Sequence, residues 1–230
     1  MTNSSNISRR RRSAREDGGP EYAAKRDELV RIAAGLFKER GFSKTRLIDI
    51  ANAAGLDRAT VYYYVGSKEE LFQEAIEGML TSNLGNAQVV SINNGLSVRD
   101  RLTAIVELLM ISYEKNYPQM YVYIQEQMHQ VAHDESSWAK IIMQKTRDFE
   151  KIVRRLLQEG IDSGELRRDI PVALASNALF GMFNWTHRWF TPDGKSDARE
   201  VAGAFASIFF DGFVAAASPG AVKLTTAQRA

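Results

Sequence analysis

The sequence predicts an all-α protein with an N-terminal three-helix unit and a C-terminal helical bundle, about nine helices in all. Three observations support this fold class. Apolar residues recur every three or four positions along most of the chain, which is the spacing of one helix face. No segment shows the period of two that marks a half-buried strand. Glycine, proline and capping residues divide the apolar stretches into helix-sized lengths.

The composition excludes several classes of protein. The 230 residues are 44% hydrophobic and 25% charged, which excludes a fully disordered chain. The absence of cysteine excludes a disulfide scaffold, a cysteine nucleophile and cysteine-ligated metal clusters. No apolar run approaches the roughly 18 residues of a membrane span, and the arginine-rich N-terminus has no signal-peptide core. We therefore expect a cytoplasmic protein with no membrane partner.

The first two helices are indicated by their apolar stripes and their ends. An apolar stripe within residues 29–37 predicts the first helix, and Gly41 ends it, because glycine is common just after a helix C-terminus. Thr45 is the expected N-terminal cap of the second helix. That helix carries its stripe within residues 47–54 and ends at Gly55.

The next two helices are indicated mainly by capping residues. Asp57 is the expected cap of a short third helix over residues 58–64. Ser67 and Glu70 have the spacing of a capping box, which predicts the start of a fourth helix. Its apolar stripe ends at Leu80, and we expect the helix to end there.

A polar stretch, residues 81–95, is expected to separate this part from the rest of the chain. Beyond it the helical spacing resumes, and serine, proline and aspartate stand at the positions where helices begin. The later helices are expected from Ser97, from Pro118 to about residue 131, from Trp138 to Gly160, from Pro171 to about Phe190, and from Asp197 to about Ala216.

Charge is distributed unevenly along the chain. Residues 1–68 contain 14 Lys and Arg against 8 Asp and Glu, whereas residues 69–230 contain 16 against 20. A basic N-terminal part on an acidic body predicts contact with a polyanion. Five arginines between positions 9 and 15 supply most of the excess, so a solvated basic tail is the alternative interpretation. Residues 1–20 lack apolar periodicity and end in Gly-Gly-Pro, which predicts a flexible arm.

The second and third predicted helices have a helix–turn–helix pattern. Both are short, and the turn between them contains Gly55. Val61 and Val65 lie four residues apart and are expected to face the core. One arginine, one threonine and two tyrosines are then left for other faces of a very short helix. Arginine binds guanine edges, and hydroxyl groups bind phosphates or base edges.

These residues resemble the TetR family of transcriptional repressors. The resemblance spans residues 29–80 and is carried by Ala-Gly-Leu-Asp-Arg-Ala-Thr-Val-Tyr-Tyr-Tyr-Val-Gly-Ser-Lys-Glu-Glu-Leu at positions 54–71. Upstream, Gly41-Phe42 and Thr45 with Asp49-Ile50-Ala51 also fit the family pattern. Tyr64 and Val65 stand where the family commonly has histidine and phenylalanine. The resemblance implies a ligand-responsive repressor rather than an enzyme. It would bind a palindromic double-stranded DNA operator as a homodimer, respond to a small effector and need no cofactor.

The resemblance also implies seven DNA-contacting residues. Phosphates would be contacted by Thr45, Arg46, Tyr63 and Lys68, the last aided by the positive end of its helix. Base edges would be contacted by Arg58, Thr60 and Tyr62. The alternative for the tyrosines is packing against neighbouring helices, which we expect for Tyr64.

The last two predicted helices are rich in small and aromatic residues. Small residues allow close approach of helices, and aromatic residues supply buried area. In the TetR family the last two helices of each subunit form a four-helix dimer interface, so the resemblance implies a homodimer there. Two recognition helices about 34–36 Å apart also fit successive major grooves. The alternative is that both stripes only close the core of the monomer.

The segment around Trp185, Arg188 and Trp189 resembles regulators of this family that sense acyl-CoA thioesters of fatty-acid or sterol metabolism. Arginine can pair with a phosphate of coenzyme A, tryptophan can stack on adenine, and an apolar bundle can hold the acyl chain. The expected effector contacts are Tyr113, Tyr121, Gln125, Trp185, Arg188 and Trp189. Alternatively, the tryptophans only cap the bundle, and the aromatic and methionine-rich residues 113–128 are ordinary core.

The same sequence has features of two other classes of protein. A repressor of an efflux system would need carboxylates near aromatic rings for a cationic drug, and Glu107, Glu114 and Glu126 are the candidates. An enzymatic function is not expected, because the sequence contains no recognisable set of catalytic residues. His129 and His133 have metal-ligand spacing, but a glutamine follows His129 where a zincin has glutamate, so no metal site is expected.

The expected domain organisation follows from these patterns. Residues 1–20 form a flexible basic arm and residues 21–66 a helix–turn–helix DNA-binding domain. Residues 67–217 form the ligand-binding and dimerisation domain, and residues 218–230 a C-terminal tail.

Overall fold

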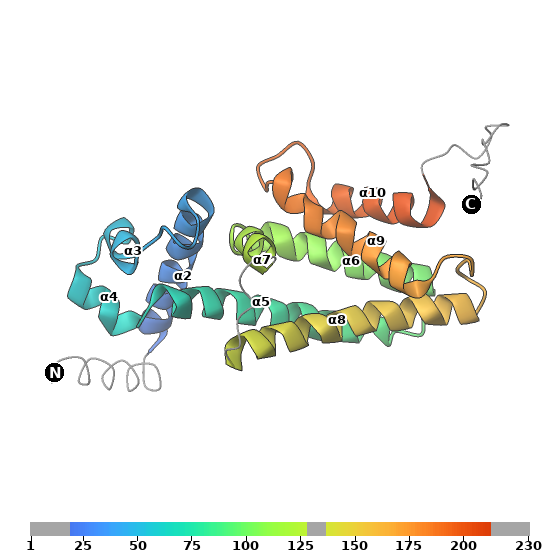
Figure 1. Ribbon diagram of the computed structural model, residues 1–230, viewed down its shortest axis with the longest axis horizontal. Coiled ribbons are helices and arrows are strands. Elements are labelled where there is room, and N and C mark those ends of the chain that lie inside the picture. The colour runs from blue at the N-terminus through green and yellow to red at the C-terminus, as the bar shows by residue number, and fades with distance from the viewer. Residues whose placement is uncertain (1–18, 128–136, 213–230) are drawn as a thin grey trace, which may run out of the picture.

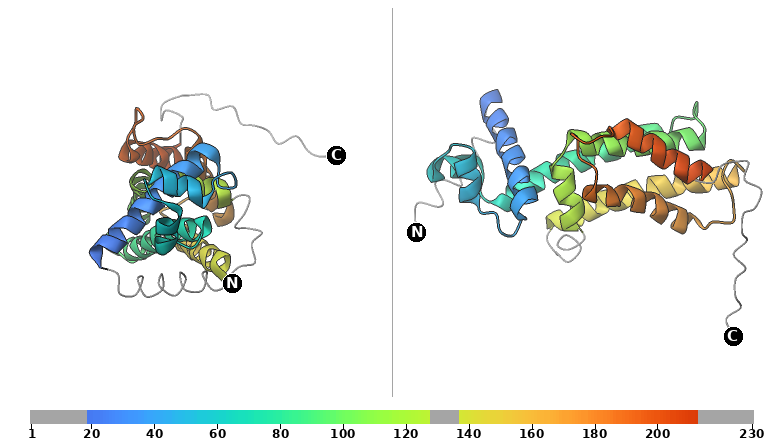
Figure 2. Two further views of the ribbon diagram at one scale, coloured as in Figure 1. Left: turned by 90° about the vertical axis from the view of Figure 1, so that its left-hand side faces the viewer. Right: turned by 90° about the horizontal axis from the view of Figure 1, so that it is seen from above.

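The computed structural model describes residues 19–127 and 137–212, and every regular element in these ranges is a helix. The first three, α2 (Pro20–Arg40), α3 (Leu47–Ala53) and α4 (Arg58–Tyr64), form a small unit at one end of the elongated molecule (Figure 1). Helix α5 (Lys68–Ser91) runs from this three-helix unit into the body (Figure 1 and Figure 2). The all-α prediction is confirmed for the described residues.

The body contains the remaining helices and one 3₁₀ segment. These are α6 (Val98–Lys115), α7 (Gln119–Gln127), α8 (Ser137–Asp162), α9 (Val172–Asn184), η2 (Trp185–Arg188) and α10 (Ala198–Asp211). Helix α10 packs along α6, and α8 packs along both α5 and α9. Residues 1–18 of the predicted basic arm and the predicted C-terminal tail lie outside the described residues, whereas Pro20, expected at the end of the arm, is the first residue of α2.

The three-helix unit has the core that the apolar spacing predicted. Leu29 and Ile50 are fully buried, and so are Val61 and Val65, the pair expected to face inward. Asp57 caps α4 as predicted, because its carboxylate accepts the N–H of Thr60 at 2.8 Å. The buried side chains of Val61 and Val65 and the Asp57 cap together fix the position of the short helix α4 on α2 and α3.

The predicted cap of the second helix was wrong by one residue. Helix α3 is capped at Arg46, whose N–H donates to the Asp49 carboxylate at 2.9 Å. Thr45 instead is fully buried, and its hydroxyl donates to the carbonyls of Gly41, at 2.9 Å, and Leu36. It ties the α2–α3 turn together. Gly41 has φ of 82°, a conformation that glycine adopts without strain.

The fourth helix does not end near Leu80, and the prediction of a separating polar stretch was wrong. Helix α5 continues to Ser91. Its second half buries a stripe of small and polar residues, Asn83, Ala87 and Ser91, each four positions after the last. The small residues allow close packing against α8 and α6, and the side chain of Arg155 donates to Ser91 Oγ at 2.8 Å. Because these buried residues are small or polar rather than strongly hydrophobic, the spacing of apolar residues does not predict that the helix continues through them.

Two corrections concern the end of the chain. The helix expected to reach Phe190 ends at Asn184, and Trp185–Arg188 is a 3₁₀ segment. There Thr186 is fully buried and its hydroxyl donates to the Phe183 carbonyl at 2.7 Å, which satisfies the last turn of α9. The last helix ends at Asp211 rather than near residue 216, because Gly212 takes the left-handed φ of 77°.

The other predicted helices of the body agree with the structure within the described residues. Ser97 caps α6 by accepting the N–H of Asp100 at 3.0 Å, and Asp197 caps α10. Helix α7 begins next to Pro118, and its predicted continuation beyond Gln127 lies outside the described residues. Helix α8 covers the predicted long helix and extends it to Asp162.

Candidate functional site

Most of the predicted DNA-contacting residues lie together at the end of the molecule formed by α3 and α4 (Figure 1). The side chain of Arg46 is 76% exposed, and Arg58 is exposed at the first position of α4. The guanidinium of Arg58 lies 5.9 Å from the ring centre of Tyr62. Arg58 and Tyr62 therefore lie next to each other on α4, and Arg46 is a second exposed cation at the start of α3.

Arg46, Thr60 and Lys68 have polar partners within the protein, and the Arg46 guanidinium forms an ion pair with the Asp49 carboxylate at 3.4 Å. Thr60 Oγ1 donates to the Asp57 carboxylate at 2.8 Å, and the two hydrogen bonds from Thr60 lower the pKa of Asp57. Lys68 Nζ donates to the Phe42 carbonyl at 2.7 Å and lies 4.5 Å from the Phe42 ring centre. Lys68 thus supports the α2–α3 turn. The buried Thr45 has no side-chain surface to offer a phosphate.

The three consecutive tyrosines occupy different environments. Tyr62 and Tyr64 are half-buried and pack against the core, whereas Tyr63 is 41% exposed. The ring of Tyr22 stacks on Tyr64 at 5.1 Å and meets Tyr63 edge-on at 5.6 Å. The expectation of packing for Tyr64 is confirmed.

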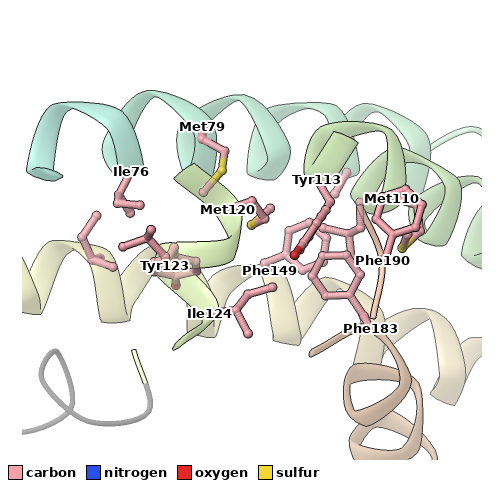
Figure 3. Close-up of a cluster of buried hydrophobic side chains, with 14 of the residues drawn as sticks. Ile76, Met79, Met110, Tyr113, Met120, Tyr123, Ile124, Phe149, Phe183 and Phe190 are labelled. Atoms are coloured by element: carbon pink, nitrogen blue, oxygen red, sulfur yellow. The ribbon is translucent and has the colours of Figure 1, made fainter. Parts of the chain in front are cut away.

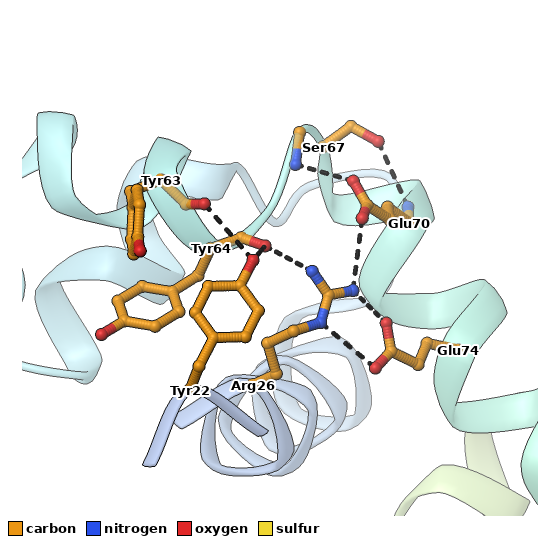
Figure 4. A network of polar contacts seen from close by, with 8 residues as sticks. Tyr22, Arg26, Tyr63, Tyr64, Ser67, Glu70 and Glu74 are labelled. Atoms are coloured by element: carbon orange, nitrogen blue, oxygen red, sulfur yellow. Dashed lines mark hydrogen bonds and ion pairs between the residues drawn. The ribbon is translucent and has the colours of Figure 1, made fainter. Parts of the chain in front are cut away.

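A buried arginine joins the helices behind this surface. Arg26, on α2, is 4% exposed and forms ion pairs with Glu70, at 3.2 Å, and Glu74 on α5. It also donates to the main-chain carbonyl of Tyr64, the last residue of α4 (Figure 4). One side chain therefore connects α2, α4 and α5.

The body contains an apolar cavity of about 230 Å³ between α5, α6, α7, α8 and α9. Its walls come from all five helices, and Figure 3 shows several of these side chains converging between them. The apolar lining consists of Leu80, Leu109, Met120, Tyr123, Ile124, Phe149, Phe180 and Phe183. The shape and lining are those of a small-molecule site.

The cavity also has a few polar groups. Tyr123 donates its hydroxyl to Thr146 Oγ1 at 2.9 Å, and Thr146 donates in turn to the Ile142 carbonyl. Burial raises the pKa of Tyr123 to about 12, so its hydroxyl stays protonated at neutral pH. Asn83 lines the cavity and is 4% exposed. The remaining polar lining residues are Lys145, Glu150 and Asn184.

None of the six predicted effector contacts lines this cavity. Tyr113 is fully buried beside Phe183, a residue that lines the cavity. Its hydroxyl has no hydrogen-bond partner among the described residues, and burial raises the pKa of this group. Tyr121 is half-buried, and Gln125 is exposed. Trp185 and Trp189 are also exposed, and the guanidinium of Arg188 lies 4.7 Å from the Trp185 ring centre. This exposed cluster directly follows Phe183 and Asn184, which do line the cavity.

The residues that line the cavity were only partly visible in the sequence. Met120, Tyr123 and Ile124 belong to the aromatic and methionine-rich stretch considered above. Phe180 and Phe183 lie in the helices whose small and aromatic residues predict a dimer interface, and Asn83 lies in the predicted polar stretch, residues 81–95. Knowing that α5 continues past Leu80 would have brought Asn83 onto the same helix face as Met79 and Ile76.

The outer face of α9 and α10 carries small and apolar residues. The exposed residues on it are Ala173, Leu174, Ala178, Gly181, Gly203, Ala204 and Ile208. An open groove of about 690 Å³ runs between α9, α10 and the end of α8, and Leu174 and Ile208 line it. Phe183 of α9 is buried in the core, whereas Phe209 and Phe210 of α10 line the groove.

The alternative chemistries have less support. Among the described residues no three metal-ligating side chains lie together, and His129 and His133 are outside the described ranges. Glu107 pairs with Arg199, and Glu114 accepts the Ala198 N–H at 3.3 Å, so neither faces the cavity. The side chain of Glu126 is not described. None of the described helices is both long and apolar enough to cross a membrane.

Comparison with known proteins identifies similar sequences and folds. Residues 29–75 match the family model for bacterial regulatory proteins of the tetR family, and residues 95–213 match that for the tetracyclin repressor-like C-terminal domain. The HTH-type transcriptional repressor KstR2 of Rhodococcus jostii RHA1 is 30% identical over 83% of this chain and 91% of its own.

Two solved structures illustrate the shared fold. The ketosteroid transcriptional regulator KstR2 of Mycobacterium tuberculosis has a TM-score of 0.76 and 25% identity, covering 82% of this chain and 94% of its own. AibR, solved with isovaleryl coenzyme A and operator DNA, has a TM-score of 0.66 and 19% identity, covering 82% and 99%. The second likeness is one of fold alone.

Proposed function

The chain belongs to the tetR family of bacterial regulatory proteins and is a ligand-responsive transcriptional repressor, and from this premise we propose how it binds DNA and what releases it. It binds a palindromic operator as a homodimer and dissociates when an acyl-CoA thioester of fatty-acid or sterol metabolism occupies the body. The observation that carries the proposal is the pairing of an exposed cationic surface on α3 and α4 with an apolar cavity that α5 borders.

The DNA contacts proposed here follow the exposure of the side chains. Arg58, Thr60 and Tyr62 on α4 approach base edges, and Arg46 and Tyr63 approach phosphates. Lys68 acts from behind, by holding the Phe42 carbonyl of the α2–α3 turn. Residues 21–66 serve as the DNA-binding domain and residues 67–217 as the effector and dimer domain, with α5 connecting them.

Replacing Arg58 with alanine is expected to weaken operator binding about 5- to 150-fold, because a base-contacting arginine contributes about 1–3 kcal/mol of discrimination. Binding to random duplex should weaken much less, since Arg58 would read bases rather than phosphates. The operator is first selected from a library of random duplexes, and affinities are measured by fluorescence anisotropy at one salt concentration. Arg147→Ala, an exposed arginine on α8, is the matched control. Equal losses on operator and random DNA would contradict base reading.

The dimer proposed here uses the outer face of α9 and α10. Small residues there, such as Gly181 and Ala204, let a second copy approach closely, and Leu174 and Ile208 supply apolar area beside the open groove. A twofold dimer places two copies of α4 against the two halves of a palindrome.

The effector proposed here spans two places. Its acyl group occupies the apolar cavity, and its polar part leaves past Asn184 toward Trp185 and Arg188, which follow in the chain. There the exposed tryptophan can stack on adenine and the guanidinium can pair with phosphate. The printed name of one similar protein supports an effector of sterol metabolism, because KstR2 is named a ketosteroid transcriptional regulator.

A second candidate effector class is a cationic drug. Glu150 lines the cavity, is half-buried and has no ion pair among the described residues. It lies with Phe149, Phe180 and Phe183 around the same space. A carboxylate beside aromatic rings suits a cation, and the protein would then control an efflux system.

Acyl-CoA thioesters are expected to release the operator from the protein, and Arg188→Ala should weaken this response about 10- to 100-fold, since a charge-assisted hydrogen bond contributes about 1.5–3 kcal/mol. DNA affinity without effector should not change. The measurement is release of labelled operator by a panel of acyl-CoA thioesters and, in parallel, cationic dyes. Lys195→Ala, an exposed cation in the following turn, is the control. Release by dyes alone would replace the thioester proposal with the efflux alternative.

A further inference from the structure

Asn83 is an unpaired amide inside the apolar cavity. The residue is 4% exposed, lines the cavity from α5, and has no hydrogen-bond partner among the described residues. Of the other polar groups on the cavity wall, Tyr123 donates to Thr146 and Thr146 to the Ile142 carbonyl, whereas Glu150 is half-buried and has no ion pair among the described residues. The amide of Asn83 is not among the fully enclosed unpaired groups of the described residues, so its donor and acceptor atoms remain open to a molecule in the cavity.

The surroundings of Asn83 restrict what that partner is. Several neighbouring wall residues, such as Leu80, Met120 and Phe149, are apolar. The ammonium of Lys145, which also lines the cavity, donates one of its three hydrogens to Thr81 Oγ1 at 2.9 Å. An amide offers one acceptor oxygen and two donor hydrogens and carries no charge. The complementary group is therefore a neutral oxygen, a hydroxyl or a keto group, carried on an otherwise apolar molecule.

We propose that Asn83 determines effector specificity by binding a neutral oxygen on the part of the effector that enters the cavity. The inference rests on the proposed effector site and adds to it that the buried part is oxygen-substituted rather than plain hydrocarbon. A site built to form a hydrogen bond rejects the analogue that lacks the partner, because its own polar group is then left unpaired.

The first test compares acyl-CoA thioesters of equal chain length, unsubstituted or carrying one keto or hydroxyl group at successive positions. For the wild-type protein, at least one oxygenated thioester should release the operator at a concentration about 10-fold or more below that of the unsubstituted one. Asn83→Leu, which keeps a similar volume, should remove or reverse that preference. Asn86→Leu, an exposed asparagine one turn further along α5, should keep it.

The second test does not depend on coenzyme A or on DNA. Binding of 2-octanone and 2-octanol is measured by calorimetry, and Asn83→Leu should weaken both about 10-fold while Asn86→Leu binds as the wild type does. Asn83→Leu should remain folded, since it replaces an unpaired amide with an apolar side chain, and circular dichroism checks this.

Together the two tests distinguish a failure of the acyl-CoA proposal from a failure of the Asn83 inference. If thioesters release the operator but keto and hydroxyl groups bring no advantage, and Asn83→Leu binds the ketone normally, Asn83 only holds a water and the inference is overturned. If no thioester acts and the ketone still depends on Asn83, the acyl-CoA proposal fails and the inference stands.

Discussion

Glutamate in place of both Leu174 and Ile208 is expected to convert the protein to a monomer and to weaken operator binding about 100-fold or more. The two side chains are 61% and 44% exposed and line the groove beside α9 and α10. In the proposed dimer they are buried, and a carboxylate buried without a partner is strongly unfavourable. A monomer loses the second half-site contact, and linked binding of two sites contributes about 10²- to 10⁴-fold.

The control for this experiment is Val89→Glu. Val89 is 68% exposed, also apolar, and lies near the end of α5, a helix that packs mainly on α6 and α8 rather than on α9 or α10. Mass is measured by light scattering after size exclusion, and operator binding by anisotropy. The control should remain a dimer with unchanged affinity. A dimeric Leu174→Glu/Ile208→Glu protein would place the interface on another face.

The structure agrees with the sequence most closely where one strong local signal marks each end of an element. Helix α4 has the predicted limits, because Asp57 caps its start and the chain turns extended at Val65. The inward pair Val61 and Val65 followed from spacing alone. In such short segments the local hydrogen bonds and one apolar contact decide the conformation, so sequence is sufficient.

The cavity could not be predicted in the same way, because it depends on five helices meeting. Asn83, Ala87 and Ser91 form a stripe that is not hydrophobic. Its burial depends on the packing of α8 against α5, which the local sequence does not indicate. The Trp185–Arg188 segment shows the same limit. A tryptophan spacing of four fits a helix equally well, and the buried Thr186, which closes the 3₁₀ turn, carries no distinctive pattern.

The site residues predicted from the family resemblance differ in how far geometry supports them. Arg46, Arg58 and Tyr63 have exposed side chains on the α3–α4 surface, as the DNA proposal requires. Thr45 and Lys68 have the right places in the chain but direct their polar atoms to carbonyls of the α2–α3 turn. Residue type and position alone do not distinguish a phosphate contact from a structural hydrogen bond.

Replacing Arg26 with methionine is expected to destabilise the protein by about 2–3 kcal/mol. Removing one partner of a buried ion pair costs about 3–5 kcal/mol, and the lower figure follows because the side chains of Glu70 and Glu74 are 24% and 32% exposed. The substitution also removes a donor from the Tyr64 carbonyl at the end of α4 (Figure 4). Thermal unfolding measures the effect, which for this chain length is a decrease of roughly 4–12 °C.

The second half of that experiment distinguishes a lost ion pair from lost packing. Arg31→Met, on the same helix but exposed, should melt like the wild type. Glu74→Gln added to Arg26→Met should recover part of the stability, because it removes a carboxylate left without its arginine. Operator affinity should decrease in Arg26→Met even below its melting temperature, since Arg26 connects α4 to α5. If melting falls but operator affinity stays unchanged, Arg26 stabilises the fold without positioning α4.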